Sequence, residues 1–202
     1  MGIEKRRGGS LDPPARADLK VRPYGKLVSS QQLFMVKHTI EYKKYTRKLS
    51  PRLKDFDYRG YYVYFITCNT YKNEDYFKDG KAVGKIIDIL RNAIREHKFR
   101  LICYCFMPDH LHLLVRGINE TSSLETLMKS FKQETAYYFK KYSNKILWER
   151  SYFDHTVRKI ENVSNICDYI LHNPIRKGIV QDCEEYPYSY VHIKDEISIG
   201  QT

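Results

Sequence analysis

Residues 100–116 have the sequence RLICYCFMPDHLHLLVR, which predicts the centre of the fold. Two segments of this stretch, Arg100 to Phe106 and His110 to Arg116, are rich in aliphatic and aromatic side chains, as β-strands are. Met107-Pro108-Asp109 lies between them and is a turn-forming insert. The stretch therefore predicts two short strands joined by a turn.

Further strands and helices are predicted on both sides of this hairpin. Apolar residues that recur at helical spacing predict helices, whereas runs of aromatic and β-branched residues predict strands. The expected elements are a strand at Tyr61–Asn69, a helix at Asp79–His97 capped by Asp79, a helix at Leu124–Tyr142, a strand at Ser151–Lys159 and a helix at Asn162–Asn173 that Pro174 ends. Glu185–Tyr190 is expected to form turns. The helix at 124–142 should bury Leu124, Leu127, Met128, Phe131 and Tyr138.

The order β-α-β-β-α-β-α predicts the fold class. It favours an α+β fold of the ferredoxin-like split βαβ kind, with a mostly antiparallel central sheet flanked by helices. A chain of 202 residues with 42% hydrophobic and 29% charged residues can bury a core, which excludes wholesale disorder. We expect a domain at 56–192, preceded by a basic, partly disordered extension at 1–55 and followed by a tail at 193–202.

Cysteines and apolar runs indicate the compartment. The five cysteines are odd in number and include no C-x-x-C pair, which is typical of reduced thiols rather than of a disulfide framework. No run approaches the ~18 apolar residues of a membrane span, and the first residues contain no apolar signal core. These features predict a cytoplasmic protein, nucleoid-associated if it binds DNA, with no membrane partner.

Charge and aromatic content favour a polyanionic partner. The chain carries 35 Lys and Arg against 24 Asp and Glu, and it holds 18 Tyr and 9 Phe. Residues 1–50 hold 12 Lys and Arg against 4 Asp and Glu, a net charge of +8. Such an extension could bind phosphates with salt-sensitive affinity, while bases could stack on exposed rings. A basic soluble protein with a solvated tail is the plainer alternative.

The segment Pro108–Val115 carries the strongest chemical signal. Because side chains alternate along a strand, His110 and His112 share one face, and Leu111, Leu113 and Val115 share the other, which should be buried. Two imidazoles on one strand face can both reach a single divalent cation. From these residues alone, the alternative to a metal site is two histidines at the surface or in ordinary hydrogen bonds, next to a core face.

Other chemistries compete for the same residues. Cys103 and Cys105 lie on one strand face just upstream, so a Cys2His2 zinc site is conceivable, although structural zinc sites usually space their cysteines more widely. Histidine-triad hydrolases need a third histidine where this chain has Leu114. No nucleophile-elbow sequence supports a serine or cysteine hydrolase.

Three ordered segments carry a family resemblance. Phe106–Val115 resembles the His-hydrophobic-His (HUH) signature of single-tyrosine DNA transposases. Trp148–His155, and Asp168–Pro174 followed by Gly178 and Tyr186–Ser189, resemble the REP-associated tyrosine transposase branch of that superfamily. The resemblance covers about residues 58–190, in the order that the family has them.

The resemblance implies an activity and a set of site residues. Such enzymes cut and join single-stranded DNA at hairpin-bearing sites through a tyrosine that becomes linked to a 5′ phosphate. Tyr169, on a C-terminal helix, matches that nucleophile, and His110 and His112 match the pair that holds a divalent metal, Mg²⁺ or Mn²⁺. Asn173, one helical turn after Tyr169, could supply a further ligand.

Less specific expectations complete the sequence-based hypothesis. Trp148 is expected in the core, and Glu149 stands where the family would favour glutamine. The partner should be single-stranded or hairpin DNA, bound by a monomer or a homodimer. The rival functions are a non-catalytic DNA-binding regulator with the same fold and a replication-initiator or relaxase type nickase. The candidate DNA contacts are Lys129, Lys132, His155, Arg158, Lys159, Arg176 and Lys177.

Overall fold

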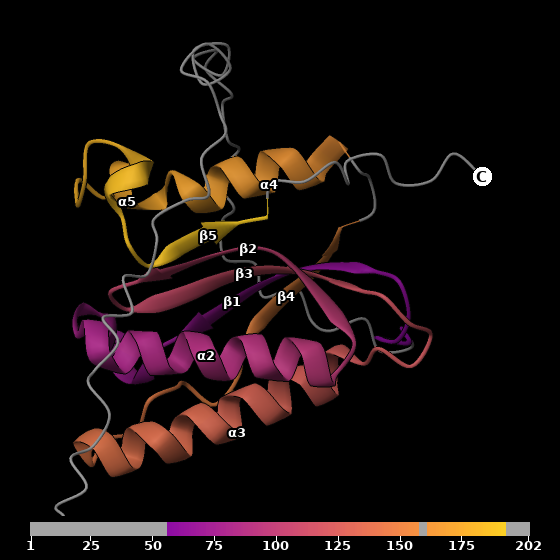
Figure 1. Cartoon of the computed structure of the whole chain (residues 1–202), viewed down its shortest axis with the longest axis horizontal. Coiled ribbons are helices and arrows are strands. Elements are labelled where there is room, and N and C mark those ends of the chain that lie inside the picture. The colour runs from indigo at the N-terminus through magenta and orange to yellow at the C-terminus, as the bar shows by residue number, and fades with distance from the viewer. Residues whose placement is uncertain (1–55, 158–160, 193–202) are drawn as a thin grey trace, which may run out of the picture.

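The computed structural model describes residues 56–157 and 161–192, which build one antiparallel sheet between two helical layers (Figure 1). The sheet contains β1 (Val63–Asn69), β2 (Phe99–Met107), β3 (His110–Gly117), β4 (Phe153–Val157) and β5 (Ser189–Val191). Its order is β4-β1-β3-β2-β5. Every neighbouring pair is antiparallel. The predicted basic extension 1–55, the tail 193–202, Arg158 and Lys159 lie outside the described residues.

Two long helices cover one face of the sheet, α2 (Gly80–Glu96) and α3 (Leu124–Ser143). The Asp79 side chain accepts hydrogen bonds from the amides of Lys81 and Ala82, so the predicted N-cap of α2 is confirmed. Strands β1 and β2 flank β3 on either side and are connected through α2. This arrangement confirms the expected split βαβ fold.

The opposite face carries α4 (Glu161–Leu171) and α5 (Asn173–Arg176). Three short 3-10 turns complete the described elements: η1 (Tyr71–Asn73), η2 (Tyr76–Lys78) and η3 (Cys183–Glu185). No helix in residues 56–157 or 161–192 has both the length and the apolar composition that crossing a membrane requires.

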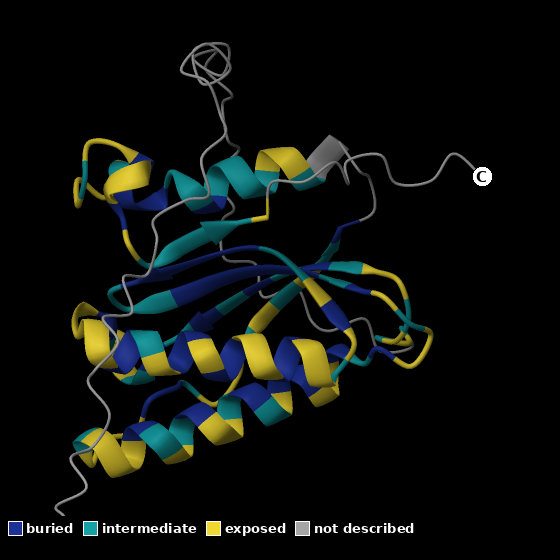
Figure 2. Ribbon diagram, viewed as in Figure 1, coloured by how far each residue is buried: buried dark blue, intermediate teal, exposed yellow. Residues whose placement is uncertain are grey.

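The alternation along β3 divides the core into two layers. Leu111, Leu113 and Val115 pack with α2 and α3, as predicted, while Leu114 packs with Ile170 of α4 on the other face. Burial is concentrated in the central strands and on the inner sides of the helices (Figure 2). On α3, Phe139 is buried and the predicted Tyr138 is only partly so.

Two predicted features near the C-terminus were wrong. Pro174 does not end the helix: α4 ends at Leu171, and Pro174 lies in the first turn of α5, where a missing N–H costs no hydrogen bond. The segment expected to form turns contributes β5, the edge strand that pairs with β2. The Tyr186 hydroxyl donates to the carbonyl of Phe106 at 2.6 Å and anchors this strand.

Candidate active site

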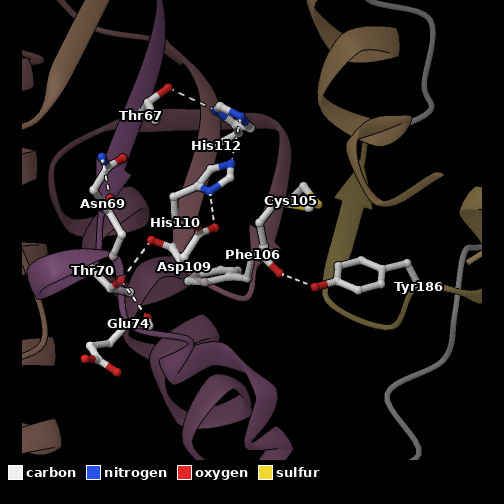
Figure 3. A network of polar contacts seen from close by, with 12 residues as sticks. Thr67, Asn69, Thr70, Glu74, Cys105, Phe106, Asp109, His110, His112 and Tyr186 are labelled. Carbon is white, nitrogen blue, oxygen red and sulfur yellow. Dashed lines mark hydrogen bonds and ion pairs between the residues drawn. The ribbon is translucent and has the colours of Figure 1, made fainter. Parts of the chain in front are cut away.

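The two predicted histidines project from the start of β3 toward the face that bears α4. Their rings lie 4.6 Å apart, and their Nε2 atoms approach to 3.2 Å (Figure 3). His112 is only 6% exposed. Both imidazoles therefore present the same nitrogen to one point.

Each imidazole is held from behind by a second side chain. Nδ1 of His110 contacts a carboxylate oxygen of Asp109, and Nδ1 of His112 lies 2.9 Å from the hydroxyl of Thr67, its partner across from β1 (Figure 3). With the ring protons on Nδ1, both Nε2 lone pairs face each other. Burial holds the pKa of His112 well below its usual range, and the charges of His110 and Arg176 act in the same direction. His112 is therefore neutral at neutral pH, the form in which an imidazole can bind a metal.

The turn before His110 is fixed by the segment that follows β1. The amide of Thr70 donates to the Asp109 carbonyl at 2.9 Å, and the amide of Phe77 donates to the Pro108 carbonyl at 3.0 Å. The buried Thr70 hydroxyl lies within hydrogen-bond distance of the carbonyls of Asp109 and Glu74. These contacts restrict how far His110 can move relative to β1.

Tyr169 enters the site from α4. Its ring centroid lies 5.6 Å from that of His112 and 6.1 Å from that of Phe65 on β1. The guanidinium carbon of Arg176 lies 4.7 Å from the same ring centroid. The fold thus brings a phenol, an imidazole pair and a cation together from β3, α4 and α5.

Asn173 connects the two C-terminal helices. Its side chain is 6% exposed, and its amide nitrogen donates to the backbone carbonyl of Tyr169 at 2.9 Å. This bond leaves the amide oxygen of Asn173 as an acceptor. Its role as a metal ligand stays a prediction.

The histidine pair fits a single divalent cation. Two nitrogens that each bind a metal at about 2.1 Å with about 100° between the bonds stand about 3.2 Å apart, which is the separation found. In the part of the chain that the structure describes, no third His, Cys, Asp or Glu completes a metal cluster. Among the described residues, further ligands to such a cation would be amide oxygens, with water or substrate oxygens beside them.

The zinc alternative does not fit this arrangement. Cys105 does lie across from His112 in the register, but its thiol packs in the core against the sulfur of Met107, 3.7 Å away. Burial raises the pKa of both Cys103 and Cys105 above that of an ordinary thiol. Such thiols are core side chains rather than metal-binding thiolates.

Two of the predicted DNA contacts lie on the side of the sheet opposite the histidines, and their role in DNA binding stays a prediction. Lys129 and Lys132 belong to α3, in the helical layer opposite the histidines. The Lys132 amine donates to the carbonyls of Glu149, Arg150 and Ser151 at 2.9, 3.3 and 3.1 Å. Lys132 therefore holds the loop that leads into β4.

The same loop contains the first residues of Trp148–His155, the segment that resembles the family, and their contacts are structural. The indole N–H of Trp148 donates to the Thr135 hydroxyl at 2.9 Å, and both side chains are buried, which confirms the core position predicted for Trp148. Glu149 accepts a hydrogen bond from the amide of Lys72 at 2.8 Å. Both contacts fix where β4 starts.

The remaining candidates lie nearer the histidines. His155 of β4 pairs with Phe65 of β1. It therefore projects from the sheet face on which Tyr169 packs. Arg176 lies against Tyr169, and Lys177 follows at the exposed end of α5. Arg158 lies outside the described residues.

Sequence reasoning missed Thr67, Phe65 and the role of Asp109. The carboxylate of Asp109, next to His110, was a usable signal, because ligating histidines commonly donate their second N–H to a carboxylate. The pairing of Thr67 with His112 depends on the register between β1 and β3, which no local pattern encodes.

Comparison with known proteins identifies the family of the chain. The family model for the IS200-like transposases matches residues 58–173. The chain belongs to this transposase family. A Haemophilus influenzae protein provisionally named as a REP-associated tyrosine transposase is 25% identical over 157 residues, covering 71% of this chain and 88% of that protein. The REP-associated tyrosine transposase of Escherichia coli K12 is 24% identical over 148 residues, covering 67% and 82%.

A solved structure supports the fold of this transposase. A REP-associated tyrosine transposase bound to a REP hairpin superposes with a TM-score of 0.54 at 18% identity, covering 66% of this chain and 81% of that one. These matches confirm the resemblance to the REP-associated branch and, with it, DNA transposition as the general activity.

Proposed function

We propose that this transposase cuts and rejoins single-stranded DNA beside a hairpin, using Tyr169 as the nucleophile and a divalent cation held by His110 and His112. The observation that carries the proposal is the 3.2 Å approach of the two Nε2 atoms beside the ring of Tyr169. The relative that binds a REP hairpin supports a hairpin as the partner.

The proposed reaction is a transesterification at phosphorus. The Tyr169 oxygen forms a bond to the phosphorus, the bond from phosphorus to the 3′ oxygen breaks, and the phenol proton is lost while the leaving oxygen gains one. The products are a free 3′ hydroxyl and a 5′ phosphotyrosine. Attack by another 3′ hydroxyl reverses these steps, so joining needs no added energy source.

Each side chain has a defined part in this scheme. When bound, the cation would offset negative charge on the scissile phosphate. Asp109 and Thr67 keep the imidazoles aimed, and Arg176 supplies a fixed positive charge beside Tyr169. Asn173 is proposed to complete the ligand set with its amide oxygen. Mg²⁺ and Mn²⁺ both suit such oxygen and imidazole ligands.

A covalent-capture experiment tests the proposal. A single-stranded DNA library with randomised hairpin stems and flanks is labelled at the 3′ end and incubated with the protein and Mg²⁺ or Mn²⁺. We expect an SDS-stable adduct that carries the 3′ label, and its sequencing identifies the preferred site. Chelation should abolish the adduct.

Substitution of the nucleophile separates the rival functions. Tyr169→Phe keeps the ring and should form neither adduct nor cleaved product, whereas Tyr137→Phe, on the outer side of α3, should react as the wild type does. Cutting by Tyr169→Phe would assign the nucleophile to another group. Binding of hairpins without any adduct from the wild type would indicate a non-catalytic regulator.

A further inference from the structure

An exposed aromatic side chain lies at the edge of the sheet, in line with Thr67 and His112 on the two neighbouring strands. Phe153 of β4 pairs with Thr67 of β1, and Thr67 pairs with His112 of β3. Directly opposed residues of antiparallel strands project to the same face. Phe153 therefore lies on the face of the histidine pair, yet it is 41% exposed.

The rest of this face is covered unevenly. Helix α4 packs on β2, β3 and β5, and Tyr169 extends from it over Phe65. Phe65 in turn lies 5.5 Å from the ring of His112. Beyond Phe65, toward β4 at the edge of the described sheet, the same face carries His155 and Phe153, both exposed. The aromatic surface thus runs from the nucleophile outward to solvent.

We infer that Phe153 stacks against a base of a nucleotide that flanks the scissile phosphate. This inference rests on the proposed function, because it places the phosphate at Tyr169 and the histidines. Two strand spacings of about 4.8 Å separate the backbones of β4 and β3, so a nucleotide next to the cut, or one beyond it, spans the distance.

The physical properties of the position favour a base as the occupant. A large apolar ring on an edge strand invites non-specific pairing, and edge strands usually carry charged residues instead. The flat ring of phenylalanine offers a base a stacking surface whatever its identity. The chain's net charge of +11 attracts the DNA backbone that brings the base there. Phe153 therefore holds the strand that Tyr169 attacks without selecting its sequence.

The test uses the full chain and a hairpin oligonucleotide with 2-aminopurine at one flanking position after another. Stacking quenches 2-aminopurine, so one or two positions beside the cut should be quenched by the wild type. Phe153→Ala should abolish this quenching and weaken binding of the flanked hairpin by about 5- to 150-fold. Binding of the same hairpin without flanks should not change.

Two further variants at this position separate stacking from simple apolar packing. Phe153→Trp should bind at least as tightly as the wild type, whereas Phe153→Leu, which keeps apolar bulk without a flat ring, should lose affinity as Phe153→Ala does. Tyr137→Ala, an aromatic loss on the outer side of α3, is the matched control and should have no effect. Full affinity and full quenching in Phe153→Leu would overturn the inference.

The Phe153→Trp variant also reports what covers the position without DNA. Its added fluorescence, relative to the buried Trp148, should be that of an exposed indole in free protein and should change on DNA addition. Added emission that is already typical of a buried indole in free protein would assign the surface to another part of the chain or to a second copy.

The outcomes also separate this inference from the proposed function. If the wild type forms no covalent adduct, the proposed function fails. If it forms one and Phe153→Ala binds and quenches normally, only this inference fails.

Discussion

The Nε2 atoms of His110 and His112 lie 3.2 Å apart, while their Nδ1 atoms contact two different side chains, Asp109 and Thr67. A pair of neutral imidazoles gains little from opposing two lone pairs. A cation between them removes the repulsion and uses both nitrogens. The arrangement thereby supports the proposal that the two histidines act as a ligand pair.

A cation should bind this pair in the absence of DNA. Titration with Mn²⁺, followed by calorimetry, should show one site in the wild type and loss of that site in His110→Ala or His112→Gln. Hairpin binding should persist in both variants, because proteins make most of their hydrogen bonds to DNA through its phosphates and sugars, and these contacts are expected elsewhere on the chain. Undiminished Mn²⁺ affinity in His112→Gln would remove the metal from the proposal.

The hydroxyl of Thr67 should tune the affinity for that cation. Thr67→Val keeps the shape and the β-branched backbone preference but removes the acceptor for Nδ1 of His112. Loss of such an orienting partner typically costs about 10- to 100-fold in metal affinity, and we expect this range for Mn²⁺ binding and for single-turnover cleavage. Thr156→Val, on the other face of β4, is the control. Equal effects of the two substitutions would contradict a role for Thr67.

The proposed nucleophile and the histidine pair meet within one chain. Tyr169 and His112 contact each other without a second copy, so each chain should hold a complete site. A mixture of His112→Gln and Tyr169→Phe proteins should therefore form no covalent adduct. Activity restored by mixing would show that chains exchange the helix that bears Tyr169.

Lys132 should matter for stability rather than for DNA. Lys132→Met removes three bonds from a charged donor to the loop before β4, and we expect the free energy of unfolding to fall by about 1–3 kcal/mol. The salt dependence of DNA affinity should stay unchanged. Lys129→Met, at an exposed position of the same helix, should alter stability by less than about 0.5 kcal/mol. A shallower salt slope in Lys132→Met would reinstate Lys132 as a phosphate contact.

Local sequence patterns predicted the central strands and helices correctly, because each of these patterns is compatible with only one local structure here. The alternation in Pro108–Val115 forces the histidines and the leucines to opposite faces, and the apolar stripe of α2 begins where the carboxylate of Asp79 can cap it. The family resemblance selected Tyr169 among 18 tyrosines, which no local pattern could do.

Contacts between distant segments account for what the sequence left out. β5 is three residues long and depends on the bond from Tyr186 to Phe106, 80 positions away. Lys132 resembles any surface lysine of an amphipathic helix until the loop at 149–151 folds over it. The position of Phe153 in line with Thr67 and His112 follows from two strand registers, neither of which is set by neighbouring residues.

The cap of α2 should give the protein a measurable acid dependence. Asp79 accepts hydrogen bonds from the Tyr142 hydroxyl and from two helix amides, and the Tyr142 bond contributes most to holding the pKa of Asp79 below its usual value. A folded pKa below the unfolded value of about 3.9 means that the stabilisation is complete above the unfolded value and is lost as the pH falls through the folded one.

Two variants of Asp79 test this dependence. Asp79→Asn keeps a good cap but does not titrate. Urea unfolding should therefore find the wild type more stable than Asp79→Asn at pH 7, by less than about 1 kcal/mol because the site is exposed, with the difference vanishing in acid. Asp79→Ala should lose about 0.5–2 kcal/mol at pH 7. Wild-type and Asp79→Asn stabilities that differ by the same amount at every pH would show that the charge of Asp79 contributes nothing.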